Sequence, residues 1–135
     1  MDIFSLQLVS PEKEHYSGST KMVVLPGEEG DFSVLPDHAP IITYLRPGRI
    51  TIKSAKGEDL IYFVASGFVK VDKNYCQVLV DYIKKKSDLN LQETKKELTN
   101  YLAKVENEKD QSEIEILKDK ITILEEEINF LEYKD

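Results

Sequence analysis

The sequence lacks several features on which whole protein classes depend. It has one cysteine, Cys76, which excludes an internal disulfide framework and a cysteine-rich metal site. Its longest apolar run covers residues 60–65, far short of the roughly 20 residues that a membrane-spanning helix needs. No basic region followed by an apolar stretch stands at the start, so we expect no secretory signal. Positive charge is not in excess either: the net charge is −7, which excludes nucleic-acid phosphates as partners.

Glycine and proline are missing from the last 68 residues, because all 6 glycines and all 5 prolines lie between Pro11 and Gly67. Both residues mark turns, and long helices exclude them. The distribution of charged residues also changes near this point in the sequence. Residues 1–86 are balanced, whereas residues 87–135 hold 7 lysines and 14 acidic residues and so carry the whole net charge. We therefore predict two domains, a strand-rich one over residues 1–86 and a helical one over residues 87–135.

The first domain shows the period-two alternation of strands. Phe4, Leu6 and Leu8 alternate with other residues, and residues 49–53 repeat the pattern. The apolar runs at 22–25 and 60–65 are typical of strands covered on both faces. Turn signals recur roughly every 8–12 residues. This spacing predicts a compact antiparallel β-sandwich or barrel of short strands.

The second domain shows the period of helices. Asn90 with Glu93, and Ser112 with Glu115, have the spacing of N-caps with capping-box partners. The polar stretch 107–111 separates two predicted helices of roughly 17 and 21 residues, which we expect to form an antiparallel hairpin. Its predicted packing seam consists of Leu91, Leu98, Leu102, Val105, Ile114, Leu117, Ile121, Leu124, Ile128 and Leu131.

The two predicted helices are unequal in apolar side chains. The second presents nine, flanks included, and the first about four. Since burial of each such side chain contributes about 1.5–3 kcal/mol, leaving three exposed costs several kcal/mol. The spare surface is expected to lie against the β-sandwich or against another protein, and the sequence leaves both open. A hairpin with an exchangeable apolar face is suited to act as a switch.

Residues that carry chemistry are few and scattered. His15 and His38 lie 23 positions apart without further ligands at metal-binding spacing. Cys76 falls inside an apolar strand pattern, as buried structural thiols do. The glycine-rich segment 26–31 lacks the Lys-Ser/Thr of a phosphate-binding loop and carries three carboxylates instead. We expect no catalytic residues, no metal and no cofactor.

One loop stands out, residues 34–43, in which Pro36 and Pro40 restrict the backbone around His38. A rigid loop of this kind suits a contact with another protein. A tight structural connection between two strands explains the same residues equally well, so both interpretations stay open here.

Five stretches together resemble the epsilon subunits of F-type ATP synthases, which are called delta in mitochondria. The combination Gly-Glu-x-Gly with Leu-Pro-x-His-Ala-Pro is the most specific part, and the resemblance covers essentially all of residues 1–86. The matching stretches are residues 8–12, 26–40, 45–50, 63–69 and 78–81.

The resemblance implies a β-sandwich followed by a helical hairpin in a non-catalytic subunit of the central rotor. Such a subunit joins the gamma shaft to the membrane ring of c subunits and couples proton flow to ATP synthesis in the catalytic alpha/beta head. It implies a peripheral position at the cytoplasmic face of a bacterial inner membrane, one copy per complex, and a monomer when isolated.

The resemblance also assigns contact residues to this sequence. The turn that faces the c ring corresponds to Glu28, Glu29, Gly30, Asp31 and Phe32. Carboxylates there suit basic groups in the polar loops of the ring. The positions directed towards gamma correspond to Ser10, His38 and Thr43.

The second domain departs from the family. Some members bind ATP on the hairpin through an Asp and Arg motif, and many extend the hairpin to block ATP hydrolysis through basic residues. Here no arginine follows Arg49, and residues 87–135 are acidic. We therefore expect no nucleotide binding by the hairpin, and weak or absent inhibition.

A soluble adaptor with a β-sandwich binding module and a coiled-coil dimerisation arm is the alternative interpretation, because the seam also suits self-association. The oligomeric state separates the two, since an isolated rotor subunit is a monomer and the adaptor is a concentration-dependent dimer.

Overall fold

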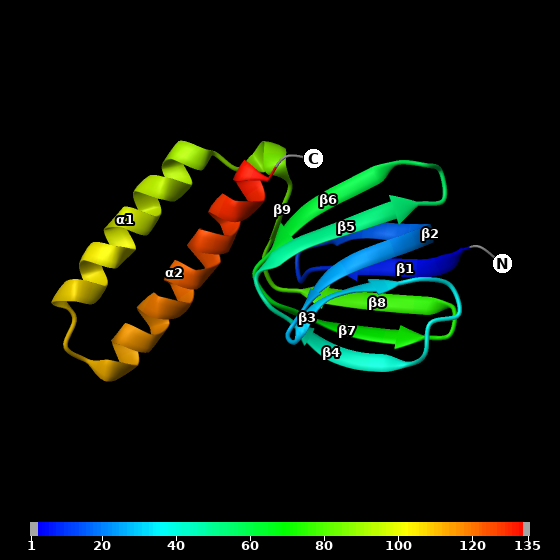
Figure 1. Ribbon diagram of the computed structural model, residues 1–135, viewed down its shortest axis with the longest axis horizontal. Helices are drawn as coiled ribbons and strands as arrows, with labels where there is room; N and C mark the ends of the chain where they lie inside the picture. Colours follow the sequence, from blue (N-terminus) through cyan, green and yellow to red (C-terminus); the bar gives the residue numbers. More distant parts are fainter. Residues whose placement is uncertain (1–2, 134–135) are drawn as a thin grey trace. The chain divides into compact units, whose positions relative to one another are not determined.

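The computed structural model describes residues 3–133 and divides into two compact units that meet between residues 85 and 86. The first unit contains strands and the second two helices, so the predicted fold class, a β-sandwich followed by a helical hairpin, is confirmed (Figure 1). The strands are β1 (Phe4–Val9), β2 (Glu14–Gly27), β3 (Gly30–Val34), β4 (Ile41–Leu45), β5 (Gly48–Ser54), β6 (Asp59–Val64), β7 (Gly67–Asp72), β8 (Tyr75–Val80) and β9 (Ile83–Lys84).

The strands form one hydrogen-bonded system that folds over into two layers. Their order is β1-β8-β7-β4-β2-β5-β6-β9, with β3 on β2 and a further pairing between β1 and β2. Most pairs are antiparallel, as predicted, but β1 and β8 are parallel. Side-chain alternation is the same in both kinds of pair, so the sequence pattern does not distinguish them. β2, at 14 residues, also exceeds the predicted short strands.

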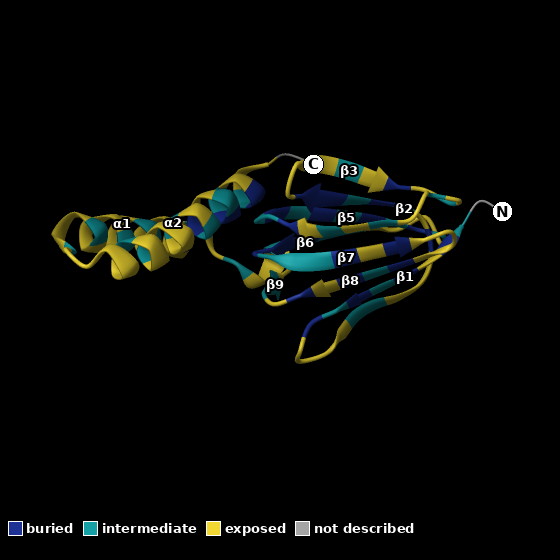
Figure 2. Cartoon of the chain, turned by 90° about the horizontal axis from the view of Figure 1, so that it is seen from below, coloured by how far each residue is buried: buried dark blue, intermediate teal, exposed yellow. Residues whose placement is uncertain are grey.

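The core lies between the two layers, where Figure 2 shows the buried residues concentrated. The apolar run at 22–25 does not behave as predicted: Val23 and Leu25 are buried, whereas Met22 and Val24 are half-buried. This part of β2 is therefore covered fully on one face only. The run at 60–65 matches the prediction in its second part, where Tyr62, Phe63, Val64 and Ala65 are all buried.

The second unit consists of a short 3₁₀ turn η1 (Lys86–Asp88), helix α1 (Leu91–Asn107) and helix α2 (Gln111–Glu132), which run antiparallel (Figure 1). The predicted cap of the first helix is confirmed, because the side chain of Asn90 accepts a hydrogen bond from the Glu93 amide at 3.0 Å. The predicted cap at Ser112 is wrong. Asp110 caps α2 and accepts from the Ser112 amide, since a carboxylate is also a strong N-cap.

Candidate functional site: an acidic turn and an apolar sheet face

An exposed acidic turn joins β2 to β3. Gly27 pairs with Gly30 across this hairpin, so Glu28 and Glu29 form a two-residue tip. Gly30 has φ 135°, a value that side-chain-bearing residues rarely adopt. Glu28, Glu29, Gly30 and Asp31 are exposed, and Phe32 anchors the turn by packing against the core. The five residues of the predicted ring-facing set thus form the tip of this hairpin and the first part of β3.

The residues of the predicted shaft-facing set lie on three separate segments. Ser10 follows β1 and is 5% exposed, with its Oγ 2.7 Å from Nε2 of His15. His38 lies in the loop before β4, where its Nδ1 donates to the Ala39 carbonyl at 2.6 Å. Thr43 sits within β4, opposite the buried Val69. Each is buried or half-buried and makes its own local contacts, so none offers a fully exposed side chain.

An apolar row crosses the outer face of the layer β1-β8-β7-β4. In the strand register Tyr44 lies opposite Phe68, Phe68 opposite Leu79, and Leu79 beside Val9. Tyr44 is 61% exposed and its ring meets that of Phe68 edge to face, with centroids 5.4 Å apart. Ile42 on the same face of β4 is also exposed. Aligned apolar side chains left in water are typical of a protein contact surface.

A shallow groove of about 370 Å³ follows this row. It is lined by Pro11, Tyr44, Leu45, Ser66, Gly67, Phe68, Leu79, Val80 and Asp81. Pro11 adjoins Ser10 and Tyr44 adjoins Thr43 in the chain, so two of the three predicted positions neighbour the groove without lining it. The sequence does contain one signal for this exposed apolar face. Residues 41–45, which form β4, are almost uniformly apolar although only alternate side chains reach the core.

The opposite end of the same face is polar. The amide oxygen of Gln7 accepts hydrogen bonds from Tyr75 at 3.1 Å and from Gln77 at 2.9 Å, and the Gln7 amide donates to Glu14 at 3.2 Å. These side chains satisfy one another and remain accessible to water. The apolar row therefore has a defined edge on this layer.

The hairpin seam is only partly buried. Of the ten predicted residues, Leu124 is buried, eight are half-buried, and Leu102 departs from the pattern because it is 48% exposed. Polar contacts near the open end join the helices: Thr94 donates to the buried Glu127 at 3.2 Å, and Lys95 lies 3.5 Å from Glu132. At 17 and 22 residues, the helices match the predicted lengths closely.

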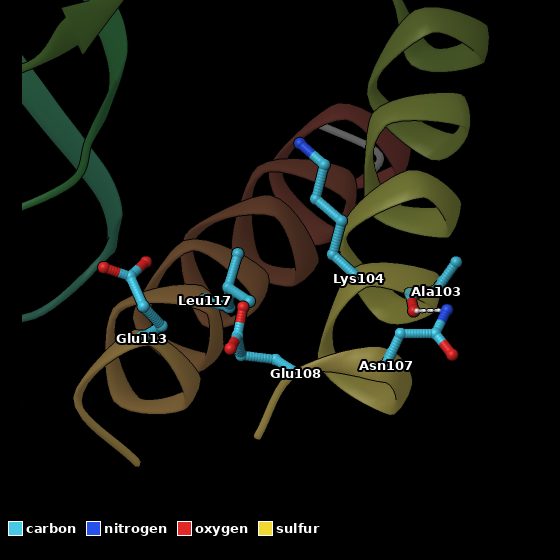
Figure 3. A pocket seen from close by; sticks show the side chains of 6 residues that line it. All are labelled: Ala103, Lys104, Asn107, Glu108, Glu113 and Leu117. Carbon is cyan, nitrogen blue, oxygen red and sulfur yellow. Dashed lines mark hydrogen bonds between the residues drawn. The ribbon is translucent and has the colours of Figure 1, made fainter. Parts of the chain in front are cut away.

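Near the loop between the helices lies a hollow of about 490 Å³ (Figure 3). It is lined by Ala103, Lys104, Asn107, Glu108, Glu113 and Leu117. Asn107 is held to the Ala103 carbonyl at 3.2 Å, the dashed bond in Figure 3. Two carboxylates and one ammonium group give this hollow a net negative charge.

Burial shifts the pKa of Cys76, Tyr62 and His15 in the first unit. It raises the pKa of the Cys76 thiol to about 12 and also raises the pKa of Tyr62. The pKa of His15 is lowered, first by burial and then by the nearby Lys13. Over residues 3–133 no group of three or more His, Cys, Asp or Glu side chains is placed to hold a metal ion. Within the same range, neither helix has the length and hydropathy of a membrane span.

Comparison with known proteins shows the family to which the sequence is related. Residues 3–86 match the family described as ATP synthase, Delta/Epsilon chain, beta-sandwich domain. An ATP synthase epsilon chain of Alkalilimnicola ehrlichii is 33% identical over 118 residues, covering 85% of this chain and 84% of its own length. The ATP synthase epsilon chain of Delftia acidovorans is 32% identical over 131 residues, covering 92% of this chain and 95% of its own length.

Solved structures support the fold. A chain in the mitochondrial ATP synthase of Euglena gracilis, in an assembly of OSCP, F1 and c-ring, aligns with a TM-score of 0.87 at 17% identity, over 97% of this chain and 82% of its own. A chain from the central stalk and c-ring of the Tetrahymena thermophila mitochondrial ATP synthase aligns with a TM-score of 0.52 at 19% identity. The alignment covers 62% of this chain and 66% of that chain. At these identities the likeness concerns the fold.

Proposed function

This chain belongs to the ATP synthase delta/epsilon family, and from that premise we propose that it is a non-catalytic subunit of the rotor stalk of an F-type ATP synthase. It couples rotation of the c ring, through the gamma shaft, to ATP synthesis in the catalytic head. Epsilon chains that match over nearly the whole length support this role. The subunit contributes binding surfaces for its neighbours, and ATP synthesis takes place on other subunits.

The apolar row on the sheet face carries this proposal. Tyr44, Phe68 and Leu79 form an ordered strip that the β-sandwich itself leaves at least partly exposed. Each side chain of this size contributes about 1.5–3 kcal/mol when it is fully buried. We assign this strip to the gamma shaft, with Ser10 and Thr43 beside it as supporting positions and His38 on the neighbouring loop.

The acidic turn is the second surface. Glu28 and Glu29 stand at its tip, and Phe32 holds its base against the core. Carboxylates presented on a rigid turn suit basic and N–H groups in the polar loops of the c ring. With both surfaces on one unit, the β-sandwich acts as the connector between shaft and ring. The chain is thereby peripheral to the membrane, at its cytoplasmic face, in one copy per complex.

The hairpin binds no ATP in this proposal. The hollow near its loop is lined by Glu108 and Glu113 against the single cation of Lys104, and such a lining repels the phosphates of a nucleotide. Isothermal titration of the full chain with ATP is expected to give no binding heat. A micromolar dissociation constant contradicts this part of the proposal and leaves the rotor role untouched.

The shaft contact is tested by rebinding the full chain to purified ATP synthase depleted of this subunit. Tyr44→Ser is expected to weaken rebinding by at least about tenfold, because buried tyrosines are frequent interface hot spots. Tyr75→Ser is the matched control, since Tyr75 lies on the same sheet face but at its polar end. Equal affinity of Tyr44→Ser and the unmodified chain, or a larger loss with Tyr75→Ser, contradicts the assignment of this strip to the shaft.

A further inference from the structure

The acidic turn is held in place by a segment nearly twenty residues further along the chain. Gly27 is paired with Leu45, the last residue of β4. On either side of this pair the backbones exchange hydrogen bonds: the Glu28 amide donates to the Tyr44 carbonyl at 2.9 Å, and the Arg46 amide donates to the Pro26 carbonyl at 3.0 Å. The position of the turn therefore depends on the β4–β5 connection.

The side chain of Arg46 adds a charged contact to this backbone pairing. Its Nη2 donates to Oδ1 of Asp31 and forms an ion pair with it. The two side chains are 41% and 66% exposed. An ion pair in water contributes at most about 1 kcal/mol to folding, so stability alone is a weak reason for it. Its stronger effect is local, because it neutralises Asp31 and fixes where that carboxylate points.

Gly48 permits the close approach of these two segments, and Gly27 permits the tight β2–β3 hairpin itself. A Cβ on Gly48 would lie 2.8 Å from Cβ of Pro26 and 3.1 Å from Nη1 of Arg46. A Cβ on Gly27 would lie 2.6 Å from the Gly30 carbonyl oxygen. The distances of 2.8 Å to Pro26 and 2.6 Å to the Gly30 oxygen are shorter than Cβ contacts in folded proteins. The glycine-rich acidic segment and the Arg-Pro-Gly segment, which are separate in the sequence, thus form one unit in space.

We propose that Arg46 is a positioning residue of the ring-facing turn. Its guanidinium group binds the carboxylate of Asp31. Glu28 and Glu29, rather than Asp31, therefore present the negative charge that recognises basic and N–H groups of the c-ring loops. This inference rests on the proposed function, and it changes the part that the family resemblance gives to Asp31. The turn is a preformed surface with two outward carboxylates, fixed from the side by the guanidinium group.

The test compares Arg46→Gln, Asp31→Asn and the double variant, each in the full chain. The first readout is hydrogen exchange of the Glu28 amide in the isolated protein, which reports how firmly the turn is held. Losing an exposed ion pair is expected to accelerate this exchange by about two- to fivefold in each variant. The double variant is expected to match the single ones, because all three remove the same contact.

The second readout is rebinding to ATP synthase depleted of the subunit. Arg46→Gln is expected to weaken rebinding by about two- to fivefold, in step with the loosened turn. If Asp31 itself contacts the ring, Arg46→Gln frees its carboxylate and rebinding becomes tighter or stays unchanged. That result overturns the inference, as does unaltered exchange of the Glu28 amide in both single variants.

A control separates this inference from the proposed function. Glu28→Gln with Glu29→Gln leaves the Arg46–Asp31 pair intact, so exchange within the turn is expected to stay unchanged while rebinding weakens by about tenfold. Rebinding that is insensitive to this double change removes Glu28 and Glu29 from the ring contact and overturns their proposed role. It does so whatever Arg46→Gln does to the exchange rate.

Discussion

The two units of this chain are built by different means. The β-sandwich has a contiguous core whose members come from the start, the middle and the end of the unit, such as Phe4, Leu45 and Val80. The hairpin depends on local signals, among them the caps at Asn90 and Asp110 and a half-buried seam. Because many distant contacts must break together in the first unit, we expect it to be the more rigid one and the second to unfold alone.

Charge sharpens the contrast. Residues 1–86 are neutral overall and place three of their 11 acidic residues in the turn for which a partner is proposed, while residues 87–135 carry the full −7. Within the hairpin, the buried Glu127 is bonded to Thr94, a contact that favours one alignment of the helices over others. Both proposed contact surfaces thus belong to the first unit. The second adds a separable acidic arm.

The largest expected effect is in the sandwich core. Leu8→Ala removes a side chain that is almost wholly buried in the cluster, and it is expected to lower the free energy of unfolding by about 2–5 kcal/mol. Leu79→Ala, at an exposed position of the apolar row, is expected to cost about 0.5 kcal/mol or less. Urea unfolding of both variants measures the difference. Equal losses contradict the division between core and contact surface.

The next effect separates the units. Ile121→Glu places a charge on the hairpin seam and is expected to remove most of the helical circular dichroism at 222 nm. Ile116→Glu makes the same change at an exposed position of α2 and is expected to keep that signal. Cys76, buried with its pKa raised to about 12, reports on the sandwich. Its labelling at pH 8 should stay slow in both variants, and fast labelling in Ile121→Glu indicates that the units unfold together.

A third prediction concerns the acidic arm in the assembled enzyme. Deleting residues 87–135 is expected to change the ATP hydrolysis rate by less than about fivefold, the lower end of typical allosteric coupling. The reason is that the inhibition implied by the family resemblance acts through basic residues, whereas this hairpin is acidic. Hydrolysis assays of the complex with full-length and shortened subunit measure this. A larger increase identifies the hairpin as an inhibitor despite its charge.

The smallest effect is that of pH on the sandwich. Because the pKa of His15 is lowered from 6.5, the folded protein binds fewer protons than the unfolded chain just below that pH. This site contributes no pH dependence well above pH 6.5, and it reduces stability as the pH falls from 6.5 towards the folded-state pKa. His15→Asn is expected to flatten this part of the stability profile, with His38→Asn as the matched control. A profile unchanged by His15→Asn contradicts the assignment.

The sequence predicts those features that depend on neighbouring residues. The helix start at Asn90, the alternation in β1 and the turn at Glu28–Glu29 follow from local chemistry. The parallel pairing of β1 with β8 and the approach of Arg46 to Asp31 depend on the path of the whole chain. The apolar row was missed for the same reason, since Tyr44, Phe68 and Leu79 lie on three strands and become adjacent only through the register.

The central claim is that this chain is a rotor subunit held by its β-sandwich. It is tested most directly by pulling down the N-terminally tagged full chain from its native membranes in mild detergent, with mass spectrometry of the bound proteins. The account predicts recovery of gamma, the c ring and the catalytic alpha and beta subunits. Recovery of the chain alone, or of unrelated soluble proteins, contradicts it and favours the adaptor with a coiled-coil arm.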